Sequence, residues 1–385
     1  MHVAARTQHL RESVIREMTR LALSCGAVNL SQGFPDFDPP EAVLAAAVAA
    51  LRNGHNQYSV SWGLPVLRER LAQRYRAMLG WDVDPDRHVA VTCGVTEAVA
   101  CAFFAVLDRG DEVLVLEPAH ETYGPAALLA DAKIVPVVLD PPNFRLDVER
   151  VAAAVTPRTR AILVNTPHNP SGRVFDHVEL AALAEVVLRH DLVVVTDEIY
   201  DEILYDGRLH VSPGSLEALR ERTITIGGLG KTFAMTGWRL GYAIAPSSLA
   251  VAVRGAHDFL TVCAATPLQA AGAAALELGA DYFNRLRAEY HERRALFCSA
   301  LDEVGLRAQW PQGAYYAMAD FTEIRADLDD LAFTHWLMNE VGVACVPGRV
   351  FYSDPARGRT QVRFAFAKRT ETLHEAVARL RAALL

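Results

Sequence analysis

The sequence lacks the features of a disulfide-stabilised, membrane-spanning or nucleic-acid-binding protein. Its six cysteines are scattered and form no C-x-x-C pair, as is typical of free thiols in a reducing compartment. No apolar run reaches membrane-spanning length without a charged or polar break. The net charge of −8, with no long basic block, disfavours non-specific binding to nucleic acid. The opening segment, MHVAARTQHLRESVIREM, has no apolar signal core, so we expect a cytoplasmic protein.

Lysine is also scarce. Among 38 basic residues only Lys133, Lys231 and Lys368 are lysines, so arginine supplies the ordinary surface charge. Lys231 stands in an apolar, glycine-rich stretch, TITIGGLGKTFAMTGWRLGY. Lysine can lose its proton and become a nucleophile, whereas arginine stays protonated in proteins. Lys231 is therefore a candidate for one of two functions, phosphate binding in a P-loop or covalent catalysis.

The middle of the chain predicts an α/β fold. Between Val89 and Ala245, short runs rich in Val, Ile and Leu alternate with segments of helical character. Continuous apolar runs indicate strands that are buried on both faces, and strands separated by helices indicate βαβ units. We expect a mostly parallel, doubly wound sheet, in which ligands bind beyond the carboxyl ends of the strands. The predicted strand ends are residues 92–94, 117–118, 165–167, 196–198 and 227–228.

The end of the chain predicts a second, smaller domain. After Thr266 a long helical pattern leads into a mixed segment, two short strand-like runs and a closing helix. This order is typical of an α+β domain. We expect an N-terminal arm (1–40) that packs with the small domain (276–385), and a large domain (41–275) between them.

The P-loop interpretation of Lys231 fails on two counts. A P-loop has the pattern G-x-x-x-x-G-K-[ST] and leads into a long helix, whose N-terminus holds the phosphates. Gly230-Lys231-Thr232 fits the end of the pattern, but the first glycine is replaced by Thr225. The following residues, FAMTGWRLGYAIA, return to strand-like character within about a turn.

Covalent catalysis requires partners for a carbonyl cofactor such as pyridoxal phosphate, and the strand ends offer them. The protonated ring nitrogen of that cofactor calls for a carboxylate, and Asp197 ends the apolar run LVVVT. The phenolic oxygen needs a donor, which Asn169 or Tyr200 could supply. Taken alone, Asp197 is equally explained as a solvated strand-end residue, and Asn169 as the turn residue before Pro170.

The phosphate of such a cofactor calls for backbone N–H groups at a helix start and a cation. The segment TCGVTEAV places Gly94, Val95 and Thr96 at the predicted start of a helix. Thr96 and Glu97 could instead be capping residues. Arg239 lies eight residues beyond Lys231 (239 − 231 = 8) and suits a fixed phosphate.

Together these residues resemble the fold-type I, pyridoxal-phosphate-dependent aminotransferases of class I/II, over essentially the whole chain. SQGFPDF is similar in particular to the branch that includes kynurenine, glutamine and methionine aminotransferases. The motifs that carry the resemblance occur in the family's order: NLSQGFPDFDPP, NQYSVSWGLPVLRERLA, VTCGVTEA, NTPHNPSG, VTDEIYDEILYDG, GLGKTFAMTGWRLGY and VRFAFA.

The resemblance implies a role for each of these residues. Lys231 would form a Schiff base with pyridoxal 5'-phosphate and later shuttle a proton, so that Lys231, Asp197 and Tyr200 are the catalytic residues. Arg363, Gly33 and Asn169 would bind the substrate, with Arg363 gripping its α-carboxylate. Tyr58 would reach the phosphate of the neighbouring subunit, which implies a homodimer with shared sites. The implied cofactor ligands are Gly94, Val95, Thr96, His120, Asn169, Asp197, Tyr200, Lys231, Arg239 and Tyr58.

Three positions depart from the family's pattern. Gly228 stands where many members have a serine that binds phosphate. His120 replaces the aromatic residue that stacks on the cofactor ring; its protonation could alter activity with pH, and a helix-surface histidine is the alternative. Thr96 stands where some acid-specific relatives carry a lysine, which favours neutral or aromatic amino donors.

The resulting hypothesis is an aminotransferase that moves an amino group from an L-amino acid to a 2-oxo acid by a ping-pong mechanism. A C–S β-lyase would use the same cofactor, and a regulatory protein could reuse the fold without its chemistry. Phe34, Trp62 and Tyr315 are candidates for an apolar substrate pocket, or alternatively for core packing. No metal ion, nucleic acid or membrane partner is expected.

Overall fold

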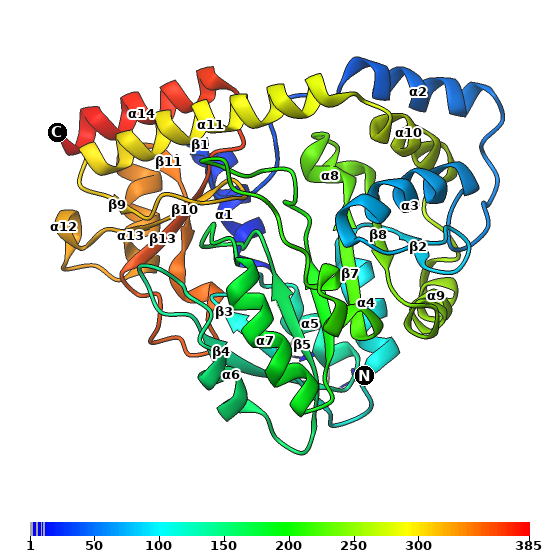
Figure 1. Cartoon of the computed structure of the whole chain (residues 1–385). Helices are drawn as coiled ribbons and strands as arrows, with labels where there is room; N and C mark the ends of the chain where they lie inside the picture. Colours follow the sequence, from blue (N-terminus) through cyan, green and yellow to red (C-terminus); the bar gives the residue numbers. More distant parts are fainter. Residues whose placement is uncertain (1–2, 5–6, 9, 11) are drawn as a thin grey trace.

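The computed structural model describes residues 3–4, 7–8, 10 and 12–385, and its centre is a seven-stranded sheet (Figure 1). The strand order is β2-β8-β7-β6-β5-β3-β4, and every pair is parallel except those that involve β8. This confirms the predicted mostly parallel α/β sheet. Its strands are β2 (Val89–Thr92), β3 (Glu112–Glu117), β4 (Lys133–Val138), β5 (Thr159–Asn165), β6 (Val193–Asp197), β7 (Thr223–Gly228) and β8 (Gly241–Ile244).

Helices cover both faces of this sheet. Alternate residues of the strands face opposite sides, so Val113 and Val115 pack with one group of helices and Leu114 and Leu116 with the other. The first group is α4 (Val95–Val106), α5 (Tyr123–Leu129) and α9 (Ser247–Thr261). The second group is α6 (Val148–Ala154) and α7 (His177–Arg189). Three further helices pack beside β2 and β8: α2 (Glu41–Arg52), α3 (Pro65–Leu79) and α10 (Thr266–Leu276).

Two details of the helical pattern differ from the sequence prediction. YDEILYDG (200–207) lies between two strands, where the alternating pattern predicts a helix, but it forms turns and a single bridge between Leu204 and Gly313. Asp201 in this segment pairs with Arg74 of α3, and Asp206 pairs with Arg294 of α11 (Ala280–Glu303). The connection to β7 contains two 3₁₀ helices, η2 (Pro213–Ser215) and η3 (Glu217–Arg222). The long helical pattern after Thr266 is two helices, because Leu278-Gly279 separates α10 from α11.

The C-terminal part contains a smaller, antiparallel sheet of order β12-β13-β10-β9. The long helix α11 lies beside the closing helix α14 (Thr370–Leu384), and both border this sheet (Figure 1). The strands are β9 (Arg307–Ala308), β10 (Tyr316–Asp320), β12 (Val346–Pro347) and β13 (Gln361–Ala365). The other helices are α12 (Thr322–Arg325), α13 (Asp330–Trp336), a π-helix, η5 (Leu337–Val341), and a 3₁₀ helix, η6 (Gly348–Phe351).

The N-terminal segment joins this C-terminal part. Helix α1 (Val14–Cys25) is followed by β1 (Val28–Asn29), which pairs in parallel with β11 (Val343–Ala344). Ala365 at the end of β13 donates its N–H to the Leu30 carbonyl (2.7 Å). The loop 31–36 that follows therefore lies against β13. The exact domain limits of 1–40, 41–275 and 276–385 stay predictions.

Candidate active site

A cavity of about 130 Å³ lies at the carboxyl ends of the parallel strands, and most of the predicted site residues line it. It is lined by Val95, Thr96, Val99, His120, Thr122, Tyr123, Asn165, Asn169, Asp197, Ile199, Tyr200, Lys231 and Arg239. A larger hollow of about 740 Å³ lies between the 141–144 loop and the small sheet, and none of the predicted site residues lines it. The chemistry of the strand ends, rather than cavity size, identifies the smaller cavity as the site.

Lys231 enters this cavity from α8 (Leu229–Thr232), a helix of only four residues that follows β7. A P-loop would require a long helix at this point. The half-buried side chain donates from Nζ to the Gly33 carbonyl oxygen at 2.7 Å. Burial, together with the positive charges of Arg363 and Arg239, lowers the pKa of Lys231 to about 7. A large share of Lys231 is therefore an uncharged amine at neutral pH, the form that attacks a carbonyl carbon.

Asp197, the last residue of β6, places its carboxylate in the same cavity. Its Oδ2 accepts a hydrogen bond from Tyr123 Oη (2.8 Å) and its Oδ1 accepts one from the Ile199 N–H (3.3 Å). Its backbone carbonyl accepts from Asn165 Nδ2 (2.8 Å), which fixes the strand end. Burial raises the pKa of Asp197 to about 6, against the opposing hydrogen bond from Tyr123, so the carboxylate is mainly ionised at pH 7.

Sequence reasoning missed Tyr123 and Asn165. Both carried a signal, since Asn165 ends an apolar strand and Tyr123 opens the helical segment after EPAH. What the sequence does not reveal is that a phenol from α5 reaches the end of β6.

Two hydrogen-bonded pairs border the site, Asn169 with Arg363 and Tyr200 with Tyr316. Arg363 on β13 donates from Nη1 to Asn169 Oδ1 (2.9 Å), and Tyr200 Oη lies 2.9 Å from Tyr316 Oη. Because Oδ1 of Asn169 is engaged by Arg363, its Nδ2 is the group left to donate toward a ligand in the cavity. The Arg363 guanidinium therefore orients Asn169, which is predicted to bind both the cofactor and the substrate.

Arg363 is almost completely buried and has a free donor. Its Nη2 donates to the Ser31 carbonyl (2.7 Å), its guanidinium lies 4.3 Å from the centre of the Tyr316 ring, and its Nε has no partner among the described residues. It forms no ion pair with a described carboxylate. A buried cation with an unused N–H is suited to bind a carboxylate from a ligand. Arg363 is therefore not a surface charge at the edge of the strand, since it is 1% exposed.

The start of α4 is a candidate phosphate site. Gly94 is the N-cap residue at φ 83°, and no side chain caps the helix through it. A Cβ at Gly94 would lie 2.5 Å from Nη2 of Arg239, and a Cβ at Gly241 would lie 2.6 Å from the Val95 nitrogen. The two glycines thus allow the helix start, the Arg239 guanidinium and β8 to come together. The Arg239 side chain donates to the Thr236 carbonyl (3.1 Å) and pairs with no described carboxylate.

The capping alternative holds for Glu97 and not for Thr96. Glu97 accepts a short hydrogen bond from the Cys93 N–H, while Thr96 is exposed and lines the cavity. Glu97 is also bonded to His257 Nδ1 (3.0 Å), which fixes the helix start against α9.

The absence of a hydroxyl at Gly228 has a steric cause. A Cβ at this position would lie 2.8 Å from Val95 Cγ2 and 3.2 Å from Ile199 Cδ1. The branched side chain of Val95 therefore occupies the space that a serine would need. A side chain at position 228 therefore requires a smaller residue at position 95.

This steric conflict leads to a prediction for cofactor affinity. Gly228→Ser alone is expected to weaken binding of pyridoxal phosphate, because its Cβ collides with Val95. Val95→Ala with Gly228→Ser is expected to bind it at least roughly tenfold more tightly than Val95→Ala alone, since a hydroxyl bonded to a charged group adds about 1.5–3 kcal/mol. Fluorescence titration of the cofactor-free proteins measures this. Equal affinity of the double variant and Val95→Ala would contradict the explanation.

The remaining predicted residues lie as follows. His120 lines the cavity, half-buried, with Nδ1 2.8 Å from Thr122 Oγ1. Burial and the charges of Arg363 and Lys231 lower the pKa of His120 to about 3, so the expectation that its protonation alters activity with pH is wrong. Gly33 lies at the edge of the site, where a Cβ would overlap the Tyr316 hydroxyl. Tyr58 is 82% exposed and does not line this chain's cavity.

Of the three aromatic candidates for the substrate pocket, Tyr315 lies beside Lys231, whereas the Phe34 ring packs against Lys368 and Trp62 packs against two arginines. Tyr315 donates to the Gly33 carbonyl (2.9 Å), and its ring centre is 5.7 Å from Lys231 Nζ. The Trp62 ring instead lies near the guanidinium groups of Arg254 (5.2 Å) and Arg68 (5.9 Å). Trp62 therefore has a packing role, the alternative that was left open for it.

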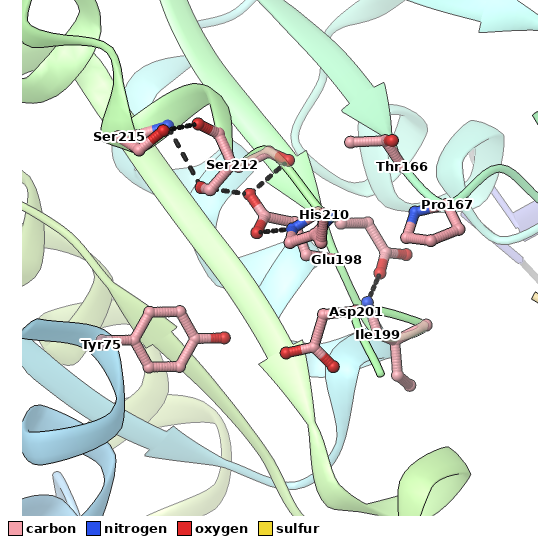
Figure 2. A network of polar contacts seen from close by, with 12 residues as sticks. Tyr75, Thr166, Pro167, Glu198, Ile199, Asp201, His210, Ser212 and Ser215 are labelled. Carbon is pink, nitrogen blue, oxygen red and sulfur yellow. Dashed lines mark hydrogen bonds and ion pairs between the residues drawn. The ribbon is translucent and has the colours of Figure 1, made fainter. Parts of the chain in front are cut away.

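Behind Asp197, a buried acid anchors the strand end from the opposite side. Glu198 is fully buried and lies between His210 and Ser212, as Figure 2 shows. Its carboxylate accepts from Ser212 Oγ (2.7 Å) and Thr196 Oγ1 (3.0 Å) and lies 2.6 Å from His210 Nε2. These contacts fix the 207–215 segment to the end of β6. Glu198 does not line the cavity and has a structural role here.

The fold and the site define a class of protein, and comparison with known families agrees with them. The family model for aminotransferase class I and II matches residues 26–380. The chain belongs to this family, whose members depend on pyridoxal phosphate, and it is an aminotransferase of the fold-type I branch.

Individual members of the family are similar to this chain over nearly its whole length. The chain is 37% identical over 372 residues to the methionine aminotransferase of Escherichia coli, with 97% of this chain and 96% of the relative covered. It is 34% identical to human kynurenine–oxoglutarate transaminase 1, with 95% and 94% covered. The solved structure of N-succinyldiaminopimelate aminotransferase from Mycobacterium tuberculosis superposes with a TM-score of 0.96 at 39% identity, covering 99% of this chain and all of that one (100%).

No helix in the described ranges has the length and apolar character needed to cross a membrane.

Proposed function

We propose that this chain binds pyridoxal 5'-phosphate and uses it to move an amino group from a neutral or aromatic L-amino acid to a 2-oxo acid. The observation that supports this most directly is the meeting of three groups around one cavity: a lysine with a pKa near 7, a buried carboxylate and an unpaired arginine at a helix start. These are the groups that an aldehyde, a protonated ring nitrogen and a phosphate require.

The residues present fit this cofactor. Arg239 and the uncapped start of α4 would hold the phosphate, together with Thr96, and Asp197 would pair with the ring nitrogen. Asn169 Nδ2 and Tyr200 would donate to the phenolic oxygen, and His120 would stack as a neutral imidazole. When bound, the cofactor supplies an electron sink and carries the amino group between two substrates.

The chain's own residues account for the remaining steps. Arg363 and Gly33 orient the substrate through its α-carboxylate. The uncharged amine of Lys231 would remove the proton from the substrate Cα and later deliver it to the cofactor carbon that came from the aldehyde. A pKa near 7 suits both transfers. Tyr200 and Tyr316 form a hydrogen-bonded pair that keeps the Tyr200 hydroxyl in place. The second half-reaction uses the same groups in reverse with a 2-oxo acid.

The preference for neutral or aromatic donors rests on Thr96. It lines the cavity and carries no charge, where a lysine would meet a distal carboxylate. L-methionine, L-phenylalanine, L-aspartate and L-ornithine, each tested with 2-oxoglutarate and pyruvate, make a suitable panel. Faster turnover with L-aspartate than with the first two would contradict this preference.

The decisive test of transamination is its dependence on the acceptor. The loaded enzyme should form about one equivalent of oxo acid from L-methionine without an acceptor and turn over continuously with one. A C–S β-lyase would instead release oxo acid continuously from an S-substituted cysteine in the absence of any acceptor. That result, without acceptor-dependent turnover, would replace the proposed function by elimination.

We also infer a homodimer in which each site receives a residue from the other chain. Tyr58 is 82% exposed, and its loop is tied to the start of α10 by a bond from Thr266 Oγ1 to the Gln57 carbonyl (2.7 Å). Close along the chain from α10, Phe259 is 93% exposed and Val262 46% exposed. Apolar groups presented in this way on a chain of this size favour burial against a second copy.

Sedimentation velocity tests the dimer. We expect about twice the chain mass for the native protein, and a shift toward monomer for Phe259→Asp, because a carboxylate would be buried in the interface. Val251→Asp, at another exposed apolar position of α9, is a control for the loss of apolar surface. A monomeric native protein would contradict the inference. The cytoplasmic location stays a prediction.

A further inference from the structure

Three cations hold the backbone of the loop 31–36 on the site. Arg363 Nη2 donates to the Ser31 carbonyl (2.7 Å), Lys231 Nζ to the Gly33 carbonyl (2.7 Å) and Lys368 Nζ to the Phe34 carbonyl (2.9 Å). Gly33 has no room for a side chain, because the Tyr316 hydroxyl fills the space beside it. The position of this short loop therefore depends on side chains from both parts of the molecule.

Two of the three cations have another function in the proposed reaction. The nitrogen of Lys231 reacts with the cofactor aldehyde, and the guanidinium of Arg363 receives the substrate carboxylate. Each of these events competes with a hydrogen bond to the loop. Lys368 lines no part of the cavity and is the one of these three cations that neither event engages.

Lys368 is well placed to act alone. It lies three residues beyond Ala365, the end of β13, with only 2% of its surface exposed, and its Nζ also lies 4.2 Å from the centre of the Phe34 ring. Burial lowers its pKa to about 8, against the attraction of Asp36, so the ammonium is mostly charged at neutral pH. A charged donor in a dry position forms a stronger bond to a carbonyl than a neutral one.

The residues after Lys368 extend the same attachment. The Arg369 N–H donates to Asp36 Oδ1 (2.5 Å), Arg369 Nε to the Asp36 carbonyl (2.8 Å), and Thr372 Oγ1 to Asp36 Oδ2 (2.7 Å). The start of α14 thus holds one end of the loop, and β13 holds the other through Arg363.

We propose that Lys368 is a positioning residue, which keeps the loop 31–36 over the site while Lys231 and Arg363 are engaged by cofactor and substrate. The inference rests on the proposed function, because it assigns Gly33 to substrate binding. Loss of Lys368 should therefore weaken substrate binding more than it slows the chemical step.

The experiment compares Lys368→Met with the native holoenzyme, using L-methionine and L-phenylalanine as donors and 2-oxoglutarate as acceptor. We expect KM for the donor to rise about tenfold, the size expected when a buried hydrogen bond to a charged donor is lost. We expect kcat to change less than threefold and the affinity for pyridoxal phosphate to stay the same. Lys368→Arg, which keeps a charged donor, should restore KM to within about threefold. Lys133→Met, at an exposed lysine at the start of β4, is the matched control and should change nothing.

An unchanged KM in folded Lys368→Met would overturn the proposal. A rise in KM that is matched by equally large losses of kcat and cofactor affinity would also overturn the proposal, because it indicates a general structural defect. If Lys368→Met does not fold, Thr372→Val is the deciding variant, because it removes one contact to Asp36 from a partly exposed position. A twofold to threefold rise in KM supports the proposal. No rise in KM overturns it. A native enzyme that does not transaminate would reject the proposed function itself, which these variants do not test.

Discussion

Lys231→Ala is expected to lower kcat for transamination by at least roughly 10⁴-fold, since it removes both the group that bonds the cofactor and the base that moves the Cα proton. The cavity offers no replacement: His120 is the nearest imidazole, but its pKa of about 3 makes it a weak base. Sodium borohydride should fix radiolabelled pyridoxal phosphate to the native protein and not to the variant. Lys133→Ala controls for loss of a lysine at an exposed site.

The lowered pKa of Lys231 adds a test that does not require turnover. The group is protonated below its pKa and uncharged above it, so the rate of covalent loading onto cofactor-free protein should rise with pH and level off above about 7. An unperturbed lysine would keep gaining reactivity up to about pH 10. Stopped-flow absorbance at a series of pH values measures the midpoint. A midpoint near 10, or covalent loading of Lys231→Ala, would show that another group is the reactive amine.

The sequence predicted the elements of the site better than their contacts. Lys231, Asp197 and Asn169 could be placed because each follows an apolar strand, and the carboxyl ends of parallel strands meet at one edge of a sheet. The strands of the large sheet were predicted from their continuous runs of Val, Ile and Leu. The alternation of strands and helices fails at YDEILYDG, which forms turns. Its acidic side chains pair with Arg74 and Arg294 from other helices instead.

The contacts that sequence reasoning missed come from residues far apart in the chain. Tyr123 bonds Asp197, Tyr316 bonds Tyr200, and Lys368 bonds Phe34, across separations of 74, 116 and 334 residues. Nothing local shows which distant residue each of them contacts. The steric reason for Gly228 was likewise hidden, because it depends on Val95 on another element. Such pairs are set by tertiary packing.

Asp197→Asn is expected to lower kcat by roughly 10³-fold, a size comparable to the loss of one electrostatic contact to developing charge in a dry site. The amide has nearly the same shape, so the hydrogen bonds that orient the side chain can largely be kept, but it cannot supply a negative charge to a protonated ring nitrogen. Steady-state kinetics give the loss in rate, and the absorbance spectrum of the loaded variant reports the altered ring. Asp201→Asn, four residues further along the chain and paired with Arg74, is the control for removing a nearby carboxylate.

The pH dependence of cofactor affinity shows whether the charge of Asp197, rather than its shape, is what matters. The pKa of Asp197 is raised to about 6, so the carboxylate exists above this pH and is lost as pH falls through it. Below about pH 6 the affinity of the cofactor-free protein for pyridoxal phosphate should therefore decline more steeply than protonation of Lys231 alone explains. Asp197→Asn should remove this additional decline, because its side chain does not titrate. Tyr123→Phe removes a hydrogen bond that favours the ionised form and should move the additional decline to higher pH. If the decline is the same in all three proteins, Asp197 is not the group that holds the ring nitrogen, and the orientation of the cofactor in the cavity must be assigned anew.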